Sequence, residues 1–354
     1  MQQQAVMKTF LPTAVLALAL LTNMKTLAQD QGWSIESRSL MPPAAASEQL
    51  RNSLANTPQP NVAVSSQAPQ TPEQWQAVVN MRSAAAPKLE DLEQQFGVSI
   101  ETDSVDGVTV YIVTPNALAE DKAGQLFLHV HGGAYVFNGG TAAVTEAIQV
   151  AVASGIHAIS VDYRMPPAHP LPAAVDDTIS VYQEILTRHE PTQIAIGGTS
   201  AGGGLALAAL LKMKELDLPL PAATYLGTPW ADLTDTSDSL HTNEGIDRIL
   251  VTYYGLLQAA AQLYAGEYDL KHPLISPLYG DFSDFPPTIL ITGTRDMLLS
   301  DSARVHRKLR DQGIVADLHV FEGLSHAGYL FELGSPENQS TMAEISEFFE
   351  AHLH

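Results

Sequence analysis

From Val98 to the C-terminus, short runs of branched and aromatic residues alternate with longer runs of helical periodicity. The predicted strands are 98–104, 108–114, 125–130, 157–163, 193–198, 222–227, 288–293 and 316–323. Strands alternate with helices in this way when helices cover both faces of a mostly parallel sheet. We therefore expect an α/β fold with a mostly parallel eight-stranded sheet, in which Asp106-Gly107 turns the first two strands into an antiparallel hairpin.

Helical patterns fill the gaps between these strands. The expected helices cover 141–155, 171–188 and 200–216, and two more begin near Asp301 and Glu337. Gly155 follows the last periodic residue of the first helix, where a left-handed conformation usually ends a helix.

Two regions lie outside the alternation. Between Trp230 and Pro273 the pattern is loop and then helix, so we expect an insertion at about 231–272 above the sheet. Residues 29–72 are rich in Gln, Ser, Ala, Asn and Pro, which favours a mobile or wrapped segment, and the pattern turns helical from Pro72 to Phe96. We expect 29–97 to supply a flexible segment and cap helices, and 98–354 to form the main domain. The alternative for 231–272 is an ordinary connecting helix.

Residues 1–28 have the pattern of a secretory signal peptide. Lys8 precedes an apolar run from Phe10 to Leu21, and Thr26 to Ala28 offer small residues for cleavage. The run is short for a membrane span, so we expect a mature periplasmic or secreted protein that begins near Gln29 and has no membrane span. The alternative is a retained anchor. The chain has no cysteine, so it cannot form a disulfide.

The charge balance restricts the partners. The chain carries 18 Lys and Arg against 39 Asp and Glu, a net charge of −21. An anionic surface repels nucleic acid and anionic lipid, so we expect neither as a partner.

Residues 198–202 read Gly-Thr-Ser-Ala-Gly and match G-x-S-x-G. They follow a predicted strand and open a long apolar helix. In that setting a serine lies on a strained turn with its hydroxyl exposed, at a helix N-terminus that offers free N–H groups. Ser200 is therefore the candidate nucleophile. The alternative is a packing or phosphate-binding turn, although the lysine of a P-loop is absent.

A serine nucleophile needs a base and an acid that follow it in the chain. His326 follows the last predicted strand in a loop of small residues, and Asp296 follows the strand before it. Both lie where open α/β sheets place their ligands. Among the competitors, Asp301 fits a helix start, His319 lies within a strand, and His352 and His354 are near the C-terminus.

His131-Gly132-Gly133 follows the strand 125–130. Glycines let the backbone approach a substrate oxygen, so we expect the N–H groups of Gly132, Gly133 and Ala201 to form an oxyanion hole. The rival interpretation makes His129 and His131 metal ligands, but a second cluster of ligands is missing from the sequence.

Together these motifs resemble the bacterial hormone-sensitive-lipase-like esterases, a GTSAG-type branch of the α/β-hydrolases. The matching stretches are HGGAY at 131–135, DYRMPPAHPLPAA at 162–174, GTSAGG at 198–203, TPWADL at 228–233, TRDMLLSD at 294–301 and LSHAGY at 324–329. The resemblance implies an α/β-hydrolase fold with a helical cap, Ser200 as nucleophile, Asp296 as acid and His326 as base. The third glycine of the family's HGGG is Ala134 here, and the acid of its YRLAPEH-like stretch is Ala168, so that acid cannot pair with Arg164.

We interpret the chain as a carboxylesterase-type serine hydrolase for short- to medium-chain esters that uses neither a metal nor an organic cofactor. The same triad would serve an amidase, a lactonase or an antibiotic-inactivating esterase. A non-catalytic small-molecule receptor on this fold is the alternative outside catalysis. By analogy with some relatives, the last strand and the helix after Glu337 could form a homodimer.

Overall fold

A computed structural model of the chain describes residue 37 and residues 39–118 and 120–354. The predicted signal peptide therefore lies outside the described residues. The chain divides into two units, Met1–Met41 and Pro42–His354. In the first unit the described residues belong to no helix or strand, and everything below concerns the second. None of the described helices has the length and apolar character needed to cross a membrane.

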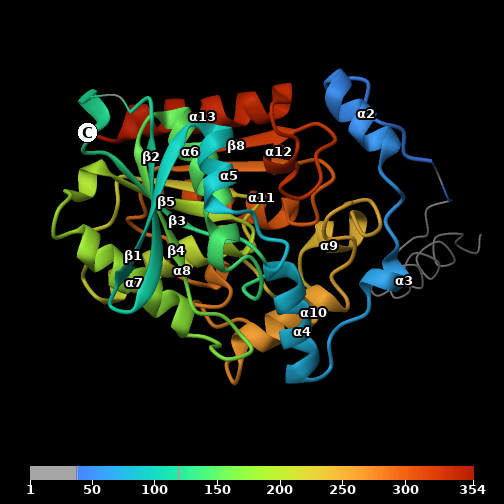
Figure 1. Ribbon diagram of the computed structural model, residues 1–354. Coiled ribbons are helices and arrows are strands. Elements are labelled where there is room, and N and C mark those ends of the chain that lie inside the picture. Colours follow the sequence, from blue (N-terminus) through green and yellow to red (C-terminus); the bar gives the residue numbers. More distant parts are fainter. Residues whose placement is uncertain (1–36, 38, 119) are drawn as a thin grey trace, which may run out of the picture. The chain divides into compact units, whose positions relative to one another are not determined.

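The second unit is built around one eight-stranded sheet in the order β1-β2-β4-β3-β5-β6-β7-β8 (Figure 1). The strands are β1 Val98–Val105, β2 Val108–Pro115, β3 Leu126–Val130, β4 His157–Asp162, β5 Ile194–Thr199, β6 Ala223–Gly227, β7 Thr288–Gly293 and β8 Ala316–Phe321. β2 runs antiparallel to both β1 and β4, and all the other pairs are parallel. The predicted mostly parallel sheet of eight strands is confirmed.

The first two strands form the expected hairpin. Val105 pairs with Val108 across the turn, and Asp106 and Gly107 both adopt positive φ, at 50° and 83°. A two-residue turn of this kind matches the right-handed twist of the strands that it joins, and Asp-Gly is among its preferred sequences.

Helices and short 3₁₀ turns occupy the rest of the unit. The α-helices are α2 Glu48–Asn56, α3 Val62–Ser65, α4 Pro72–Ser83, α5 Leu89–Phe96, α6 Thr145–Ser154, α7 Ala173–Ile185, α8 Ala201–Glu215, α9 Asp238–Thr242, α10 Leu256–Ala265, α11 Leu299–Asp311, α12 Gly328–Phe331 and α13 Pro336–His352. The 3₁₀ turns are η1 Glu120–Lys122, η2 Gly140–Val144, η3 Pro191–Gln193 and η4 Pro277–Tyr279. Gly155 ends α6 with φ at 65°, as its position predicted.

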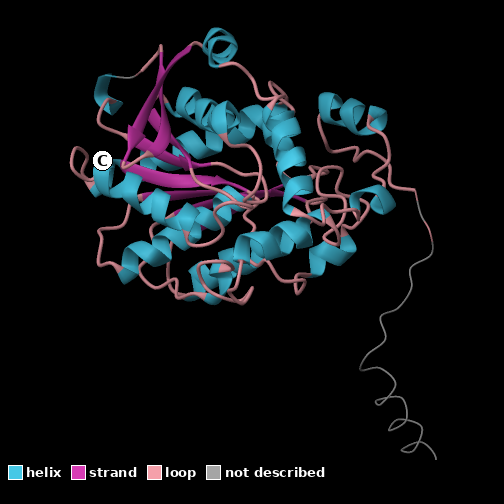
Figure 2. Cartoon of the chain, turned by 60° about the horizontal axis from the view of Figure 1, so that its bottom comes forward, coloured by secondary structure: helices cyan, strands magenta, loops and turns pink. Residues whose placement is uncertain are grey.

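Both faces of the sheet are covered, as Figure 2 shows. One core packs the sheet against α6 and α13, and the other packs it against α7, α8 and α11. Neighbouring residues of β3 enter different cores: Phe127 lies in the first and Leu128 in the second. Because both faces are buried, the central strands read as continuous apolar runs rather than alternating ones.

The N-terminal part of the unit differs in detail from the sequence pattern. The helical pattern from Pro72 to Phe96 is divided between α4 and α5 by a break that contains Pro87. The polar segment before it contains α2, which the composition did not suggest. Ser47 caps α2 by accepting a hydrogen bond from the Leu50 N–H, and Leu50 is fully buried.

Arg164 has a partner although the family's acid is replaced by Ala168. The buried carboxylate of Asp177 on α7 accepts hydrogen bonds from Arg164 Nε and Nη2, at 2.9 and 2.6 Å, and from its backbone N–H, at 2.8 Å. Asp177 therefore ties the segment after β4 to α7.

We expect Asp177→Ala to lower the free energy of unfolding by about 2 kcal/mol, because hydrogen bonds to a buried charged group are lost and the Arg164 N–H is left without its acceptor. Urea unfolding followed by circular dichroism measures the change. Asp176→Ala is the matched control, since this neighbouring carboxylate on α7 is exposed. Equal stability of the two variants would contradict this role of Asp177.

Candidate functional site

Ser200 lies on the turn between β5 and α8, and its backbone is strained. Its φ of 63° and ψ of −124° lie in a region that residues with a side chain rarely adopt. Three backbone hydrogen bonds hold the turn: the Ser200 N–H donates to Gly227 O, and Ser200 O accepts from the N–H groups of Gly204 and Trp230. The side chain is partly exposed. The turn thus presents a reachable hydroxyl at the carboxyl end of the sheet.

The two glycines of the motif are required by the neighbouring strand. A Cβ at Gly198 would lie 2.0 Å from Val130 O, and a Cβ at Gly202 would lie 2.1 Å from the same oxygen. Any side chain at either position would push the turn away from the end of β3. Glycine therefore lets α8 begin directly against β3.

Asp296 and His326 are brought together. Asp296 follows β7 and His326 follows β8, and both side chains are buried. Nδ1 of His326 and Oδ1 of Asp296 are 3.1 Å apart and form a hydrogen bond. The carboxylate also accepts hydrogen bonds from Thr292 Oγ1, at 2.7 Å, and from the Leu298 N–H, at 2.8 Å. These contacts fix the orientation of the acid toward the imidazole.

Burial and charge act in opposite directions on His326. Burial alone would lower its pKa, but the charge and hydrogen bond of Asp296, together with the charge of Asp247, outweigh that effect. The pKa of His326 therefore lies above the usual value for histidine. The pocket favours the protonated imidazole.

The histidine loop is joined to the serine turn through Tyr329. Its hydroxyl lies 2.8 Å from Thr199 Oγ1, next to Ser200 in the chain. Within the described part of the chain, His326 is hydrogen-bonded to Asp296 through Nδ1 and to Asp247 through its backbone N–H, and neither bond reaches Ser200. Catalytic hydrogen bonds are often long in free enzymes and tighten when substrate binds.

The loop after β3 lies against the serine turn. A Cβ at Gly132 would lie 3.4 Å from Ser200 Cβ, which measures how close the two backbones are. Gly133 has φ at 117°, and Ala134 and Tyr135 also adopt positive φ. The backbone N–H groups of Gly132, Gly133 and Ala201 donate no backbone hydrogen bond to any residue that the structure describes. These N–H groups belong to the loop after β3 and to the first residue of α8, directly after Ser200.

His131 supports this loop. Its Nδ1–H donates to Gly132 O at 2.8 Å, and its ring stacks on Tyr163 with centroids 4.1 Å apart. The Tyr163 hydroxyl donates to His131 O at 2.6 Å. Burial lowers the pKa of His131 to about 3, so the ring is neutral. Its contacts orient the loop.

Sequence reasoning missed a buried polar network behind the serine, centred on Glu146 of α6. The carboxylate accepts hydrogen bonds from the Thr199 N–H at 3.2 Å and from the Thr199 hydroxyl. His129 Nε2 lies 3.1 Å from Glu146 Oε2, and its Nδ1 lies 2.9 Å from Ser160 Oγ. The only available signal was an isolated charge on an otherwise apolar helix.

His129 thus uses both ring nitrogens within this network. Across the residues that the structure describes, no group of three or more His, Asp or Glu side chains is arranged to hold a metal ion. Of the other competitors, His319 pairs with Glu344 at 3.0 Å. Asp301 accepts hydrogen bonds from the Ala231 and Asp232 N–H groups, at 3.0 and 2.9 Å.

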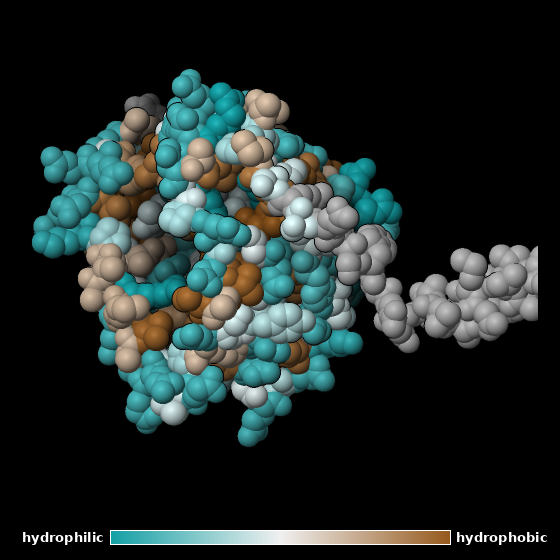
Figure 3. All heavy atoms as spheres, turned by 90° about the vertical axis from the view of Figure 1, so that its right-hand side faces the viewer, coloured by the Kyte–Doolittle hydropathy of each residue, from teal (hydrophilic) through white to brown (hydrophobic). Residues whose placement is uncertain are grey.

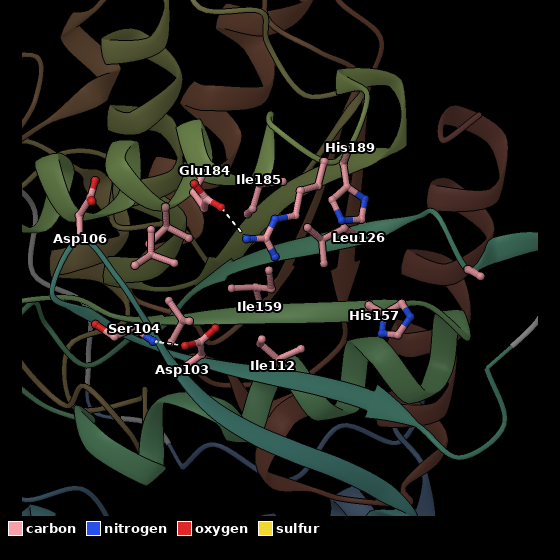
Figure 4. A pocket seen from close by; sticks show the side chains of 15 residues that line it. Asp103, Ser104, Asp106, Ile112, Leu126, His157, Ile159, Glu184, Ile185 and His189 are labelled. Atoms are coloured by element: carbon pink, nitrogen blue, oxygen red, sulfur yellow. Dashed lines mark hydrogen bonds and ion pairs between the residues drawn. The ribbon is translucent and has the colours of Figure 1, made fainter.

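Two hollows lie outside this group of residues. One of about 580 Å³ is bordered by the segment 66–75 and by α10. The other, of about 490 Å³, lies between the β1–β2 hairpin and α7. In Figure 4, His157 and His189 stand at one end of this second hollow and Asp103 and Asp106 at the other. It includes the first residues of β3 and β4, so it lies at the amino ends of the parallel strands, whereas Ser200 lies at their carboxyl ends.

Comparison with known proteins gives a consistent family. A family model described as alpha/beta hydrolase fold matches residues 127–330. An esterase of Acinetobacter venetianus is 34% identical over 235 residues, which cover 65% of this chain and 76% of that protein.

Solved structures agree. The crystal structure of an esterase, E25, has a TM-score of 0.88 and 46% identity, and covers 91% of this chain and 99% of its own. The crystal structure of an esterase from the bacterial hormone-sensitive lipase family has a TM-score of 0.67 and 31% identity, and covers 81% of this chain and 100% of its own. We conclude that this chain belongs to the alpha/beta hydrolase fold family, as an enzyme of its hormone-sensitive-lipase-like esterase branch.

Proposed function

We propose that the chain hydrolyses carboxylic esters through an acyl-enzyme, with Ser200 as nucleophile, His326 as general base and acid, and Asp296 as the carboxylate that orients the imidazole. The single observation that carries this proposal is the buried Asp296–His326 hydrogen bond, which lies in loops joined to a strained, partly exposed serine turn. A carboxylate at Nδ1 leaves Nε2 as the nitrogen that can take a proton.

In the first half of the reaction, the Ser200 oxygen attacks the ester carbonyl while Nε2 of His326 takes the hydroxyl proton. The carbonyl oxygen becomes negative in the tetrahedral intermediate. The N–H groups of Gly132, Gly133 and Ala201, which have no described partner, are the donors that we assign to this oxygen. One such donor is worth about 3 kcal/mol of the barrier.

The intermediate then collapses. The bond from carbon to the alcohol oxygen breaks, and the imidazolium gives its proton to the leaving alcohol. In the second half, a water molecule loses a proton to the same imidazole and attacks the acyl carbon. Collapse of the second intermediate returns the proton to Ser200 and releases the carboxylic acid. Asp296 stabilises the imidazolium in both halves.

We further propose that the N-terminal helices and the insertion 231–272 form a cap that limits the acyl chain. The two segments are in contact, because a Cβ at Gly255, just before α10, would lie 2.4 Å from the backbone of Ser66. Trp75 of α4 is buried against Phe137 of the loop after β3, with ring centroids 6.2 Å apart. Figure 3 looks onto this side of the molecule, which is hollowed and partly lined by hydrophobic atoms. A cap that closes over the Ser200 turn would favour short to medium acyl chains.

The pattern of residues 1–28 supports action outside the cytoplasm, in the periplasm or as a secreted protein, after cleavage near Ala28. β8 pairs only with β7 among the described strands, so the sheet has an edge there. This edge and the helix α13 beside it are the surface that we propose for a homodimer.

We expect Ser200→Ala to lower kcat on p-nitrophenyl acetate by roughly six orders of magnitude, because the attacking oxygen is removed. The release of p-nitrophenol measures the rate, and circular dichroism checks that the variant is folded. Ser340→Ala, an exposed serine on α13, should keep the rate of the unchanged enzyme. If the Ser200 variant were as active as the unchanged enzyme, the proposed role of Ser200 as nucleophile would be contradicted.

The rate should fall on the acid side at a higher pH than a free histidine would give. His326 acts as a base only when its imidazole is neutral, and its pKa is raised above 6.5. As the pH falls, kcat/KM should therefore reach half of its maximum while the pH is still above 6.5. A pH profile with an ester that does not ionise measures this midpoint. A midpoint at or below 6.5 would show that the carboxylates of Asp296 and Asp247 do not raise the pKa of His326.

Acyl length should matter strongly. We expect kcat/KM for p-nitrophenyl acetate and butyrate to exceed that for the palmitate ester by roughly tenfold or more, since a bounded pocket rejects added methylenes. The series is measured with equal detergent in every assay. A preference for palmitate would contradict the proposed cap.

A further inference from the structure

A second buried carboxylate lies beside the Asp296–His326 pair. Asp247 belongs to the insertion, outside any helix, and its side chain is fully buried. Oδ1 accepts hydrogen bonds from the N–H groups of Ile249 and Leu250, at 2.8 and 3.2 Å. These two contacts fix the carboxylate within its own segment. The reaction steps proposed above assign this buried acid no part.

The other oxygen of Asp247 reaches both catalytic loops. Oδ2 accepts hydrogen bonds from the Met297 N–H at 2.9 Å and from the His326 N–H at 3.3 Å. Met297 directly follows Asp296 in the chain. One oxygen atom therefore joins the loop of the acid to the loop of the base, in addition to the direct bond between their side chains.

Other residues of the insertion contact the same two loops. Asn243 Nδ2 donates to Asp296 O at 2.8 Å, and the Arg248 N–H donates to Ser325 Oγ at 3.2 Å. The insertion thus holds the backbone on both sides of the Asp296–His326 hydrogen bond. Asp247 is the member of this set that contacts both loops with a single atom.

Asp247 also places a negative charge near the imidazole. The described charged groups near His326 are Asp296, on the loop after β7, and Asp247, on the insertion. The side chain of Arg248 is directed elsewhere, to Ser53, Thr57 and Glu332. Burial and the charge of Asp296 raise the pKa of Asp247, while His326 lowers it. The interaction of Asp247 with His326 is thus favourable when the imidazole is protonated.

We infer that Asp247 is a positioning residue for catalysis: its carboxylate fixes the loops of Asp296 and His326 relative to each other and adds a second negative charge that stabilises the imidazolium. This inference rests on the proposed function of that pair. It gives the insertion a direct part in the reaction besides any contact with substrate. Asp247 itself touches no substrate atom in this scheme.

The test is Asp247→Asn, which keeps the size of the side chain but removes the charge and one acceptor oxygen. We expect kcat to fall about ten- to a hundredfold with KM little changed, since hydrogen bonds to a charged group are lost. The acid-side midpoint of kcat/KM should move to lower pH, because the pKa of His326 falls when a nearby negative charge is removed. Rates are divided by the fraction of enzyme that a fluorophosphonate labels, so that only folded sites are counted.

The matched control is Asp301→Asn. Asp301 is also buried and accepts hydrogen bonds from backbone N–H groups of the same insertion, but it makes no hydrogen bond to Ser200, Asp296 or His326. We expect its acid-side midpoint to match that of the unchanged enzyme. An equal shift in both variants would indicate a general loosening of the insertion and would overturn the inference.

A second variant covers the case in which Asp247→Asn does not fold. Asp247→Glu keeps the charge and displaces the carboxylate by one methylene, so we expect a lower kcat with the acid-side midpoint unchanged. An unchanged kcat in Asp247→Glu, or a midpoint that falls, would overturn the inference.

The two levels of the argument fail separately. If Ser200→Ala is inactive and Asp247→Asn behaves as the unchanged enzyme, the positioning role is wrong and the proposed function stands. If Ser200→Ala keeps full activity, the proposed function is wrong and this inference falls with it.

Discussion

The carbonyl oxygen of Val130, at the end of β3, lies only 2.0 Å from where a Cβ at residue 198 would be and 2.1 Å from one at residue 202. This close approach requires glycine at both positions. It also brings the backbone of Gly132 beside Ser200, because both follow neighbouring parallel strands. Successive strands are added on one side of β3 up to this point and on its other side from β5 onward. Open α/β folds bind their ligands where the strand order reverses in this way. The rest of the site is arranged around this contact between two strand ends.

Much of this arrangement could be predicted from the sequence because its signals are local. The central strands are apolar runs bounded by turn residues, and the sheet of eight strands is confirmed. Asp296 and His326 could be singled out because each follows a strand that ends at the same edge, and they are hydrogen-bonded to each other. Their roles, and that of Ser200, stay predictions. The N-terminal segment was harder, since its polar composition hides α2, which is held by the buried Leu50 and by hydrogen bonds of Ser47 and Ser53 to distant residues.

The residues that could not be predicted act through contacts between distant parts of the chain. Glu146 is 53 residues from Thr199, whose N–H it accepts, and Asp247 is 79 residues from His326. Glu146 stands out in its local window only as an isolated charge on an apolar helix, and nothing in a local window distinguishes Asp247 from an exposed carboxylate. Burial explains their importance, because an ionised group removed from water must find several donors, and backbone N–H groups near the catalytic loops supply them. The acidic composition of the chain made these two residues harder still to recognise among so many carboxylates.

Arg248 links the site to the N-terminal segment. Its guanidinium contacts Ser53 and Thr57, at the end of α2, and Glu332, just after α12, while its own backbone neighbour is Asp247. The polar segment that contains α2 therefore contacts Arg248, the residue that follows Asp247 in the chain. On the inference about Asp247, exchanging α2 between relatives would change turnover as well as the choice of substrate. Variation in α2 is thus a route by which the rate can be adjusted while the catalytic residues stay the same.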